Sequence, residues 1–169
     1  MVLGRRITVL IGVLLIVASL SYAFSPVLAD PGNGTFAMNL GSSTVNGNLQ
    51  NAIIQSNSVS LSMILNGYVQ TSIGPVPITA NGMWVGLRNG TLLSGDIQDV
   101  TGTVHMCILF WCGQATFVGQ GQWAGTLAST EGAGTFEGTV TFISSDFSQI
   151  HLNQPAPVSG TWSAEFQLT

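Results

Sequence analysis

The two cysteines are the pair of residues best placed to do chemistry together. Cys107 and Cys112 are the only cysteines of the chain, and they bracket four large apolar residues, Ile108, Leu109, Phe110 and Trp111. If residues 108–111 form a four-residue hairpin loop, the two sulfur atoms face each other across it. We therefore predict a disulfide, which a loop-entropy argument values at about 2 kcal/mol for so short a ring.

Two chemical roles for the cysteines, as a redox-active pair or as metal ligands, have less support than a structural disulfide. A redox-active pair favours the shorter Cys-x-x-Cys spacing beside a base or a helix N-terminus. A metal site would have to recruit His105 and His151, which are far apart in the sequence and show no ligand spacing. We predict no metal site and no cofactor.

The apolar residues between the cysteines have two interpretations. Exposed at a hairpin tip, four such side chains would be costly in water. Either Ile108–Trp111 fold back as a plug over the end of the domain, or they form an exposed contact for a partner, a membrane or a ligand. The sequence does not decide between them.

The acidic residues suggest a catalytic pair only weakly. Asp96 with Asp99, or Glu131 with Glu137, could supply the two carboxyl groups of an acid–base mechanism. However, Asp96 and Asp99 lie in a turn-like stretch, and Glu137 falls on a polar strand face. The chain has no nucleophile elbow, no His-Glu-x-x-His and no phosphate loop. We therefore name no catalytic residue and do not expect an enzyme.

The first 29 residues have the pattern of a secretory signal. Arg5 and Arg6 precede an uncharged apolar run over residues 7–24, and Val27-Leu28-Ala29 offers a cleavage site. We predict a signal peptide at 1–29, a single all-β domain at 30–169, and a secreted or cell-surface location. In the alternative, residues 7–24 stay uncleaved and anchor the protein in a membrane.

The charge of residues 30–169 limits the partners. Arg88 is their only basic residue and stands against seven acids, a net charge of 1 − 7 = −6. Such a surface cannot neutralise a phosphate backbone, so nucleic acid is excluded as a partner. Two acceptor sequons, beginning at Asn33 and Asn89, predict a glycoprotein.

Beyond residue 30, apolar side chains recur at every second position. From Val59 to Val69 the odd positions are apolar or glycine, while the even positions are mostly Ser, Asn and Gln. Residues 113–127, 132–142 and 158–168 repeat this alternation. Strand side chains point alternately to opposite faces, so each segment predicts a strand with one buried face, typical of antiparallel sheet. Breaks are predicted at Asn46–Asn48 and, as a hairpin turn, at Asn89-Gly90.

Four triplets of the form Gly-x-aromatic-x-small suggest how the sheet closes. They are centred on Trp84, Trp123, Phe136 and Trp162, and residues 119–127 are echoed at 132–140. Small residues beside a large ring leave room for a ring from a neighbouring strand, and they permit sharp bends. We predict an antiparallel β-barrel or a tightly curled β-sandwich of roughly eight or nine strands. The triplets are similar to those of calycin barrels such as lipocalins and avidins, over three residues at a time and with no companion motif, so no family is assigned.

Three functions are compatible with this sequence. The first is a secreted or surface structural protein that associates with itself or with another surface protein by β-strand addition, with Thr35–Gln50 as the donor segment. The second is a barrel that binds a small apolar ligand between Trp84, Trp123, Phe136 and Trp162. The third is an extracellular hydrolase. We place them in that order.

Overall fold

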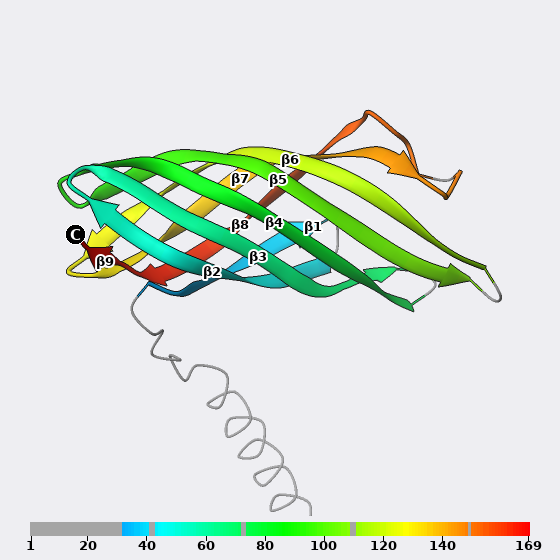
Figure 1. Ribbon diagram of the computed structural model, residues 1–169, viewed down its shortest axis with the longest axis horizontal. Helices are drawn as coiled ribbons and strands as arrows, with labels where there is room; N and C mark the ends of the chain where they lie inside the picture. The colour runs from blue at the N-terminus through cyan, green and yellow to red at the C-terminus, as the bar shows by residue number, and fades with distance from the viewer. Residues whose placement is uncertain (1–31, 41–42, 72–73, 109–110, 149) are drawn as a thin grey trace, which may run out of the picture.

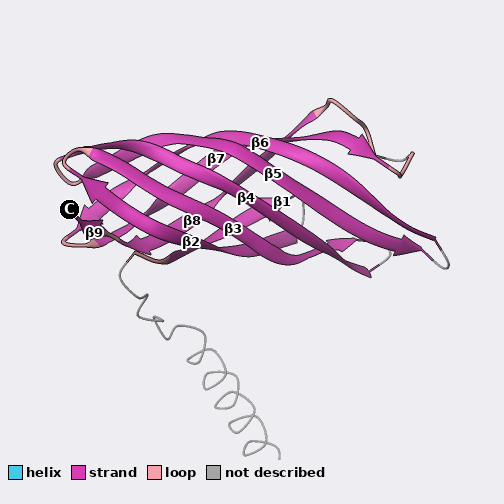
Figure 2. Ribbon diagram, viewed as in Figure 1, coloured by secondary structure: helices cyan, strands magenta, loops and turns pink. Residues whose placement is uncertain are grey.

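The protein is all-strand in the part of the chain that its computed structural model describes. The described residues are 32–40, 43–71, 74–108, 111–148 and 150–169, and Figure 2 shows strands and loops throughout them. No helix in this part is long and apolar enough to span a membrane. The predicted signal peptide at 1–29 and the alternative anchor at 7–24 lie outside the described residues.

The strands form a closed barrel of up-and-down topology. Each strand pairs with its sequence neighbours in antiparallel fashion, and β1 closes the cylinder by pairing with β8. The short strand β9 lies outside this cycle and adds in parallel to β2. The strands, shown in Figure 1, are β1 (Gly34–Leu40), β2 (Ser43–Gln55), β3 (Ser58–Thr71), β4 (Gly74–Asn89), β5 (Leu92–Ile108), β6 (Trp111–Ala128), β7 (Glu131–Ser145), β8 (Pro155–Glu165) and β9 (Gln167–Leu168).

The predicted alternation determines which side chains fill the barrel. On β3, Val59, Leu61, Met63 and Leu65 are buried, whereas their even-numbered neighbours are at least partly exposed. The same parity holds on β6, β7 and β8. Leu168 is an exception, since β9 departs from the inward-facing row of β8 and leaves this side chain 54% exposed. Burial of one face of every strand gives a single apolar core along the barrel axis.

The predicted break at Asn46–Asn48 is wrong. Strand β2 runs straight through these residues, and they pair with β1 from Ala37↔Asn46 to Thr35↔Asn48. Gly47 faces the interior, where a Cβ atom would collide with the ring of Phe36. The glycine is therefore needed for space inside the barrel and not for a turn. The hairpin predicted at Asn89-Gly90 is confirmed, with Asn89 paired to Leu92 and Gly90 at φ +63°.

Pairs of glycines on facing strands let the sheet curl tightly enough to close. Gly86 pairs with Gly95, Gly121 with Gly138, and Gly125 with Gly134. A Cβ on Gly134 would meet the carbonyl oxygen of Ala124 and come within 2.5 Å of the Cα of Gly125. Only glycine allows two strands to approach so closely. The sheet therefore closes into a barrel, which is the first of the two architectures that the sequence predicted.

We expect Gly134→Ala to destabilise the barrel by about 1–3 kcal/mol, because the new methyl group forces apart two strands that touch through their backbones. The matched control is Thr135→Ala, the next residue on β7, whose exposed side chain predicts a change within about 0.5 kcal/mol. Urea unfolding followed by tryptophan fluorescence measures both. Equal effects of the two substitutions would show that β6 and β7 are not in close contact at this point.

Candidate functional site

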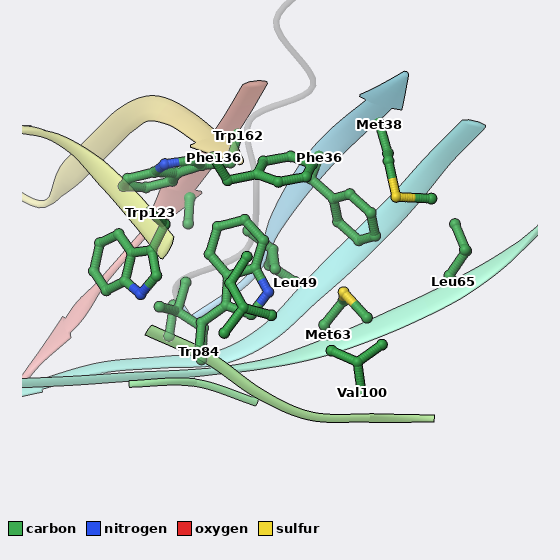
Figure 3. Packing of buried hydrophobic residues seen from close by; sticks show 14 of the residues in the cluster. Phe36, Met38, Leu49, Met63, Leu65, Trp84, Val100, Trp123, Phe136 and Trp162 are labelled. Carbon is green, nitrogen blue, oxygen red and sulfur yellow. The ribbon is translucent and has the colours of Figure 1, made fainter. Parts of the chain in front are cut away.

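The structure brings together the four rings that the sequence proposed as ligand contacts. Trp84, Trp123, Phe136 and Trp162 are all buried, and Trp84 stands at their centre with 0% exposure. Its ring centroid lies 5.2 Å from that of Phe136, 6.1 Å from Trp123 and 6.3 Å from Trp162. Phe36 of β1 completes the cluster at 6.2 Å from Trp84 (Figure 3). Most of these contacts are tilted or edge-to-face, the arrangements that aromatic rings prefer.

Two of the tryptophans share one mode of packing. The ring of Trp123 lies across the Gly86–Gly95 pair, and its Nε1 donates a hydrogen bond to the Val85 carbonyl at 3.3 Å. Trp162 does the same over the Gly125–Gly134 pair, donating to the Ala124 carbonyl at 3.2 Å. In each case the indole reaches over one strand to the second, and the carbonyl precedes the far glycine. Glycine on both strands makes this possible, because a Cβ on the far glycine would meet the ring and a Cβ on the near glycine would meet the backbone of the far strand.

This shared packing reflects an internal repeat that was not among the features predicted from the sequence. Trp84, Trp123 and Trp162 follow one another at intervals of 39 residues (123 − 84 and 162 − 123), and the glycines two positions before them keep the same interval. The similarity between residues 119–127 and 132–140, which are 13 residues apart, relates the neighbouring strands β6 and β7. The 39-residue interval instead spans a whole hairpin. The constant spacing of the three triplets that contain tryptophan is the sequence signal that reveals this repeat.

Trp84 breaks the pattern. Its partner across the ladder on β3 is Leu61, which in turn lies opposite the bulge of β2 between Gln50 and Ile53, where Ala52 is buried. Neither Leu61 nor Ala52 is a glycine, so Trp84 lacks the glycine pair over which the other two indoles lie. Trp84 therefore projects into the middle of the barrel. Its Nε1 is the only buried side-chain nitrogen or oxygen in the described part of the chain without a hydrogen-bond partner.

A small void lies beside Trp84. Its volume is about 40 Å³, and among the side chains that line it from the inward face of the strands only Trp84 carries a polar group. Met38 and Met63 line it from β1 and β3, and Figure 3 shows the nitrogen edge of Trp84 on the side of the interior where Phe36 and Met63 lie. Trp123 and Trp162 do not line this void. Of the four predicted ligand contacts, Trp84 and Phe136 are thus placed to touch a molecule held there.

A much larger groove crosses the outside of the same wall. It has a volume of about 1170 Å³ and runs over β5, β6, β7, β8 and the end of β1. Its lining is polar on the outward positions, with Gln98, Gln120 and Gln122 among them. Ile97, Gly119, Gly138 and Val158 line both the groove and the void. Only the thickness of the sheet separates the two spaces at this point.

The carboxyl groups considered for catalysis are spread over the outer face. Asp96, Asp99 and Glu137 all line the groove. Asp96 and Glu137 each pair with Gln122, one from either side, so an entire strand stands between them. Glu131 faces Glu165 across β7 and β8 and lies away from Glu137, six residues along its own strand. No group of three or more metal-ligating side chains occurs among the described residues.

The predicted disulfide is confirmed, but the loop it closes is shorter than predicted. Cys107 and Cys112 are bonded and both lie on the exposed face of the hairpin formed by β5 and β6. The ladder continues past them to an Ile108↔Trp111 pair, so a two-residue connection replaces the predicted four-residue loop. The side chains of Ile108, Leu109, Phe110 and Trp111 lie outside the described residues, so their role as a plug or a contact stays a prediction.

The remaining predicted positions lie on the surface or in the wall. Asn33 and Asn89 of the two sequons are both exposed, and their glycosylation stays a prediction. The proposed donor segment, Thr35–Gln50, is built into the barrel: β1 pairs with β2 on one side and with β8 on the other. Its release would open the cylinder.

Comparison with known proteins gives no relative from which to transfer a site. No protein-family model matches the chain, and no curated protein or solved structure is significantly similar to it.

Removal of the disulfide should loosen the hairpin tip. We expect the double variant Cys107→Ser/Cys112→Ser to lose about 2 kcal/mol of stability, the entropy that the short closed ring removes from the unfolded chain. Urea unfolding and amide hydrogen exchange at Met106 and Gly113 measure the loss. The control is His105→Ser/Gln114→Ser, which replaces a facing exposed pair two residues inside the bridge. Unchanged exchange and stability without the disulfide would mean that the tip is held by other contacts.

Proposed function

We propose that this protein is a binding barrel that takes up a small apolar molecule beside Trp84. The observation that carries the proposal is the void of about 40 Å³ in the apolar interior, lined in part by aromatic rings and by the methionines Met38 and Met63. A closed barrel of eight strands has an interior that side chains can just fill or that can hold one small ligand. Apolar walls with few polar groups are typical of ligand sites.

The size of the void limits what can enter without rearrangement. An engineered cavity of roughly 150 Å³ accepts benzene, so a space of about 40 Å³ accommodates a much smaller body. Met38 and Met63 are the side chains best able to enlarge it, because methionine is unbranched and rotates about three bonds. A slender ligand that displaces these two chains fits the site better than a broad, rigid one.

The outer groove provides a route to this void. Strand β5 bulges at Gln98 and Asp99, and its register with both β4 and β6 shifts there. Asp99 adopts a left-handed backbone, with φ of 53°, as the extra residue of a bulge does. The ladder is thus interrupted where groove and void share a wall, and local opening at the bulge would admit a ligand. We further propose that residues 1–29 direct export, so that uptake takes place outside the cell.

Binding can be followed at the methionines. Titration of the protein with n-pentane should shift the ¹³C methyl resonances of Met38 and Met63, because both line the void. Met83 lies on the outer face, 45% exposed, and serves as an internal control that should not move. Saturation with n-pentane and then with n-hexane that leaves Met38 and Met63 unshifted would refute the binding barrel.

A substitution that fills the void should abolish this binding. Ala80 lines the void from β4, and Ala80→Val adds two carbon atoms at that place. We expect this variant to lose the n-pentane response while keeping or slightly gaining stability, as cavity-filling substitutions do. Thr79→Val, on the exposed face of the same strand, is the control that should leave the response intact.

The projecting hairpin favours a second candidate function, self-association by strand addition. In Figure 1 the paired ends of β5 and β6 extend beyond the neighbouring end of β4. Strand β4 pairs with β3 from Gly74 onward but with β5 only from Ile78. Pro75 and Pro77 lack the N–H groups that would extend the ladder, so residues 105–108 of β5 have a free edge in the described structure. Free edges are where strands of another copy add.

Light scattering during size-exclusion chromatography tests this second candidate. If copies pair through the hairpin, the native protein forms oligomers, and His105→Lys/Gln114→Lys returns it to the monomer because lysine on an edge opposes pairing. Thr135→Lys on β7, a strand with neighbours on both sides, should remain oligomeric. A native protein that is monomeric at all concentrations would eliminate self-association.

A further inference from the structure

We propose that the ligand of this barrel carries a hydrogen-bond acceptor, such as a carbonyl oxygen, and that the indole N–H of Trp84 donates to it. The inference rests on the proposed binding function and specifies its chemistry. It makes Trp84 the residue that selects among apolar molecules of similar size.

The first step is that the indole N–H of Trp84 has no backbone carbonyl in the barrel wall to donate to. The equivalent groups of Trp123 and Trp162 donate to backbone carbonyls at 3.3 and 3.2 Å, which satisfies both. Trp84 instead faces Leu61 and, beyond it, the bulge of β2 around Ala52, so it has no glycine pair across which to reach a carbonyl. Among the three indoles whose side chains the structure describes, the one without a backbone acceptor belongs to the tryptophan that lines the void.

The second step is that an unpaired buried donor is costly. Native structures leave few such groups, because a buried donor that gives up water without gaining a partner loses its hydration. Trp84 is fully buried, and its ring is surrounded by Phe36, Trp123, Phe136 and Trp162. A molecule that enters the void with an acceptor relieves this cost, whereas a pure hydrocarbon leaves it in place.

The third step concerns water as the alternative occupant. A buried water usually needs two to four polar partners, about three on average. Gln120 and Thr139 touch the void, but they lie on outward-facing positions of β6 and β7, where Gln120 is exposed. The inward side chains offer one polar group, Trp84 Nε1. A body that is apolar over most of its surface and polar at one atom matches this lining better than water does.

Paired probes test the inference. The protein is titrated with 2-pentanone and with n-pentane, which have the same chain length and differ by one carbonyl group. In the native protein, 2-pentanone should shift the ¹H–¹⁵N indole resonance of Trp84 downfield, as a new hydrogen bond does, and n-pentane should shift it much less. Trp84→Phe keeps an aromatic ring and removes the donor, and it should weaken 2-pentanone about tenfold relative to n-pentane.

Trp162→Phe is the matched control, since it removes an indole N–H that is already bonded to Ala124. It should leave the ratio of the two affinities unchanged. Binding of both probes with no ketone-specific shift at Trp84, or an unchanged ratio in Trp84→Phe, would overturn the role of Trp84 and leave the binding barrel intact. Binding of neither probe would overturn both. If Trp84→Phe does not fold, the indole shift in the native protein still decides the matter.

Discussion

The barrel depends on the packing of large aromatic rings against glycines on neighbouring strands. A closed cylinder of eight strands has little interior space, and this chain brings three tryptophans and several phenylalanines into it. Three of these rings find room because a neighbouring position has no side chain: Trp123 lies against Gly86, Trp162 against Gly125, and Phe136 against Gly160. The same glycines let facing strands approach closely, so the residues that make space for the core also bend the sheet that encloses it. Packing and curvature therefore have one origin.

The candidate site is the place where a buried ring, Trp84, has no glycine pair to pack against. Two hairpin repeats supply a tryptophan with a glycine pair and a carbonyl, whereas Trp84 faces Leu61 and, beyond it, the bulge of β2 around Ala52. Phe36 comes from β1, the strand that closes the barrel, and its ring packs against that of Trp84. The consequence is a displaced ring, an unpaired donor and a void next to it. Departures from an otherwise consistent pattern are where function is expected.

The outside of the barrel follows a different rule. Its strands carry Ser, Thr, Asn and Gln, with few charges to oppose association between edges. Closure removes most edges, since every strand from β1 to β8 has two neighbours. The exception is the far end of β5 and β6, where prolines in β4 stop the ladder and a disulfide holds the hairpin together. The interior and this hairpin are thus separate features, and a ligand in one does not require a partner at the other.

The amino-acid sequence by itself determined the class of structure and the composition of its core. Alternation with period two identifies the inward residues of β3, β6, β7 and β8 because strand geometry is local and the same everywhere. The disulfide could be predicted for the same reason, because a short hairpin places two residues that are five apart in the sequence, Cys107 and Cys112, opposite each other. Gly47 was misread as a turn because its purpose is space for Phe36, which is local only once β1 and β2 have paired. Only the tertiary structure decided that Trp84 lacks a partner, because this depends on Leu61 of β3 and on the bulge of β2 opposite it. Which positions become neighbours across a barrel is set by closure and register, and a single sequence does not display these long-range pairings.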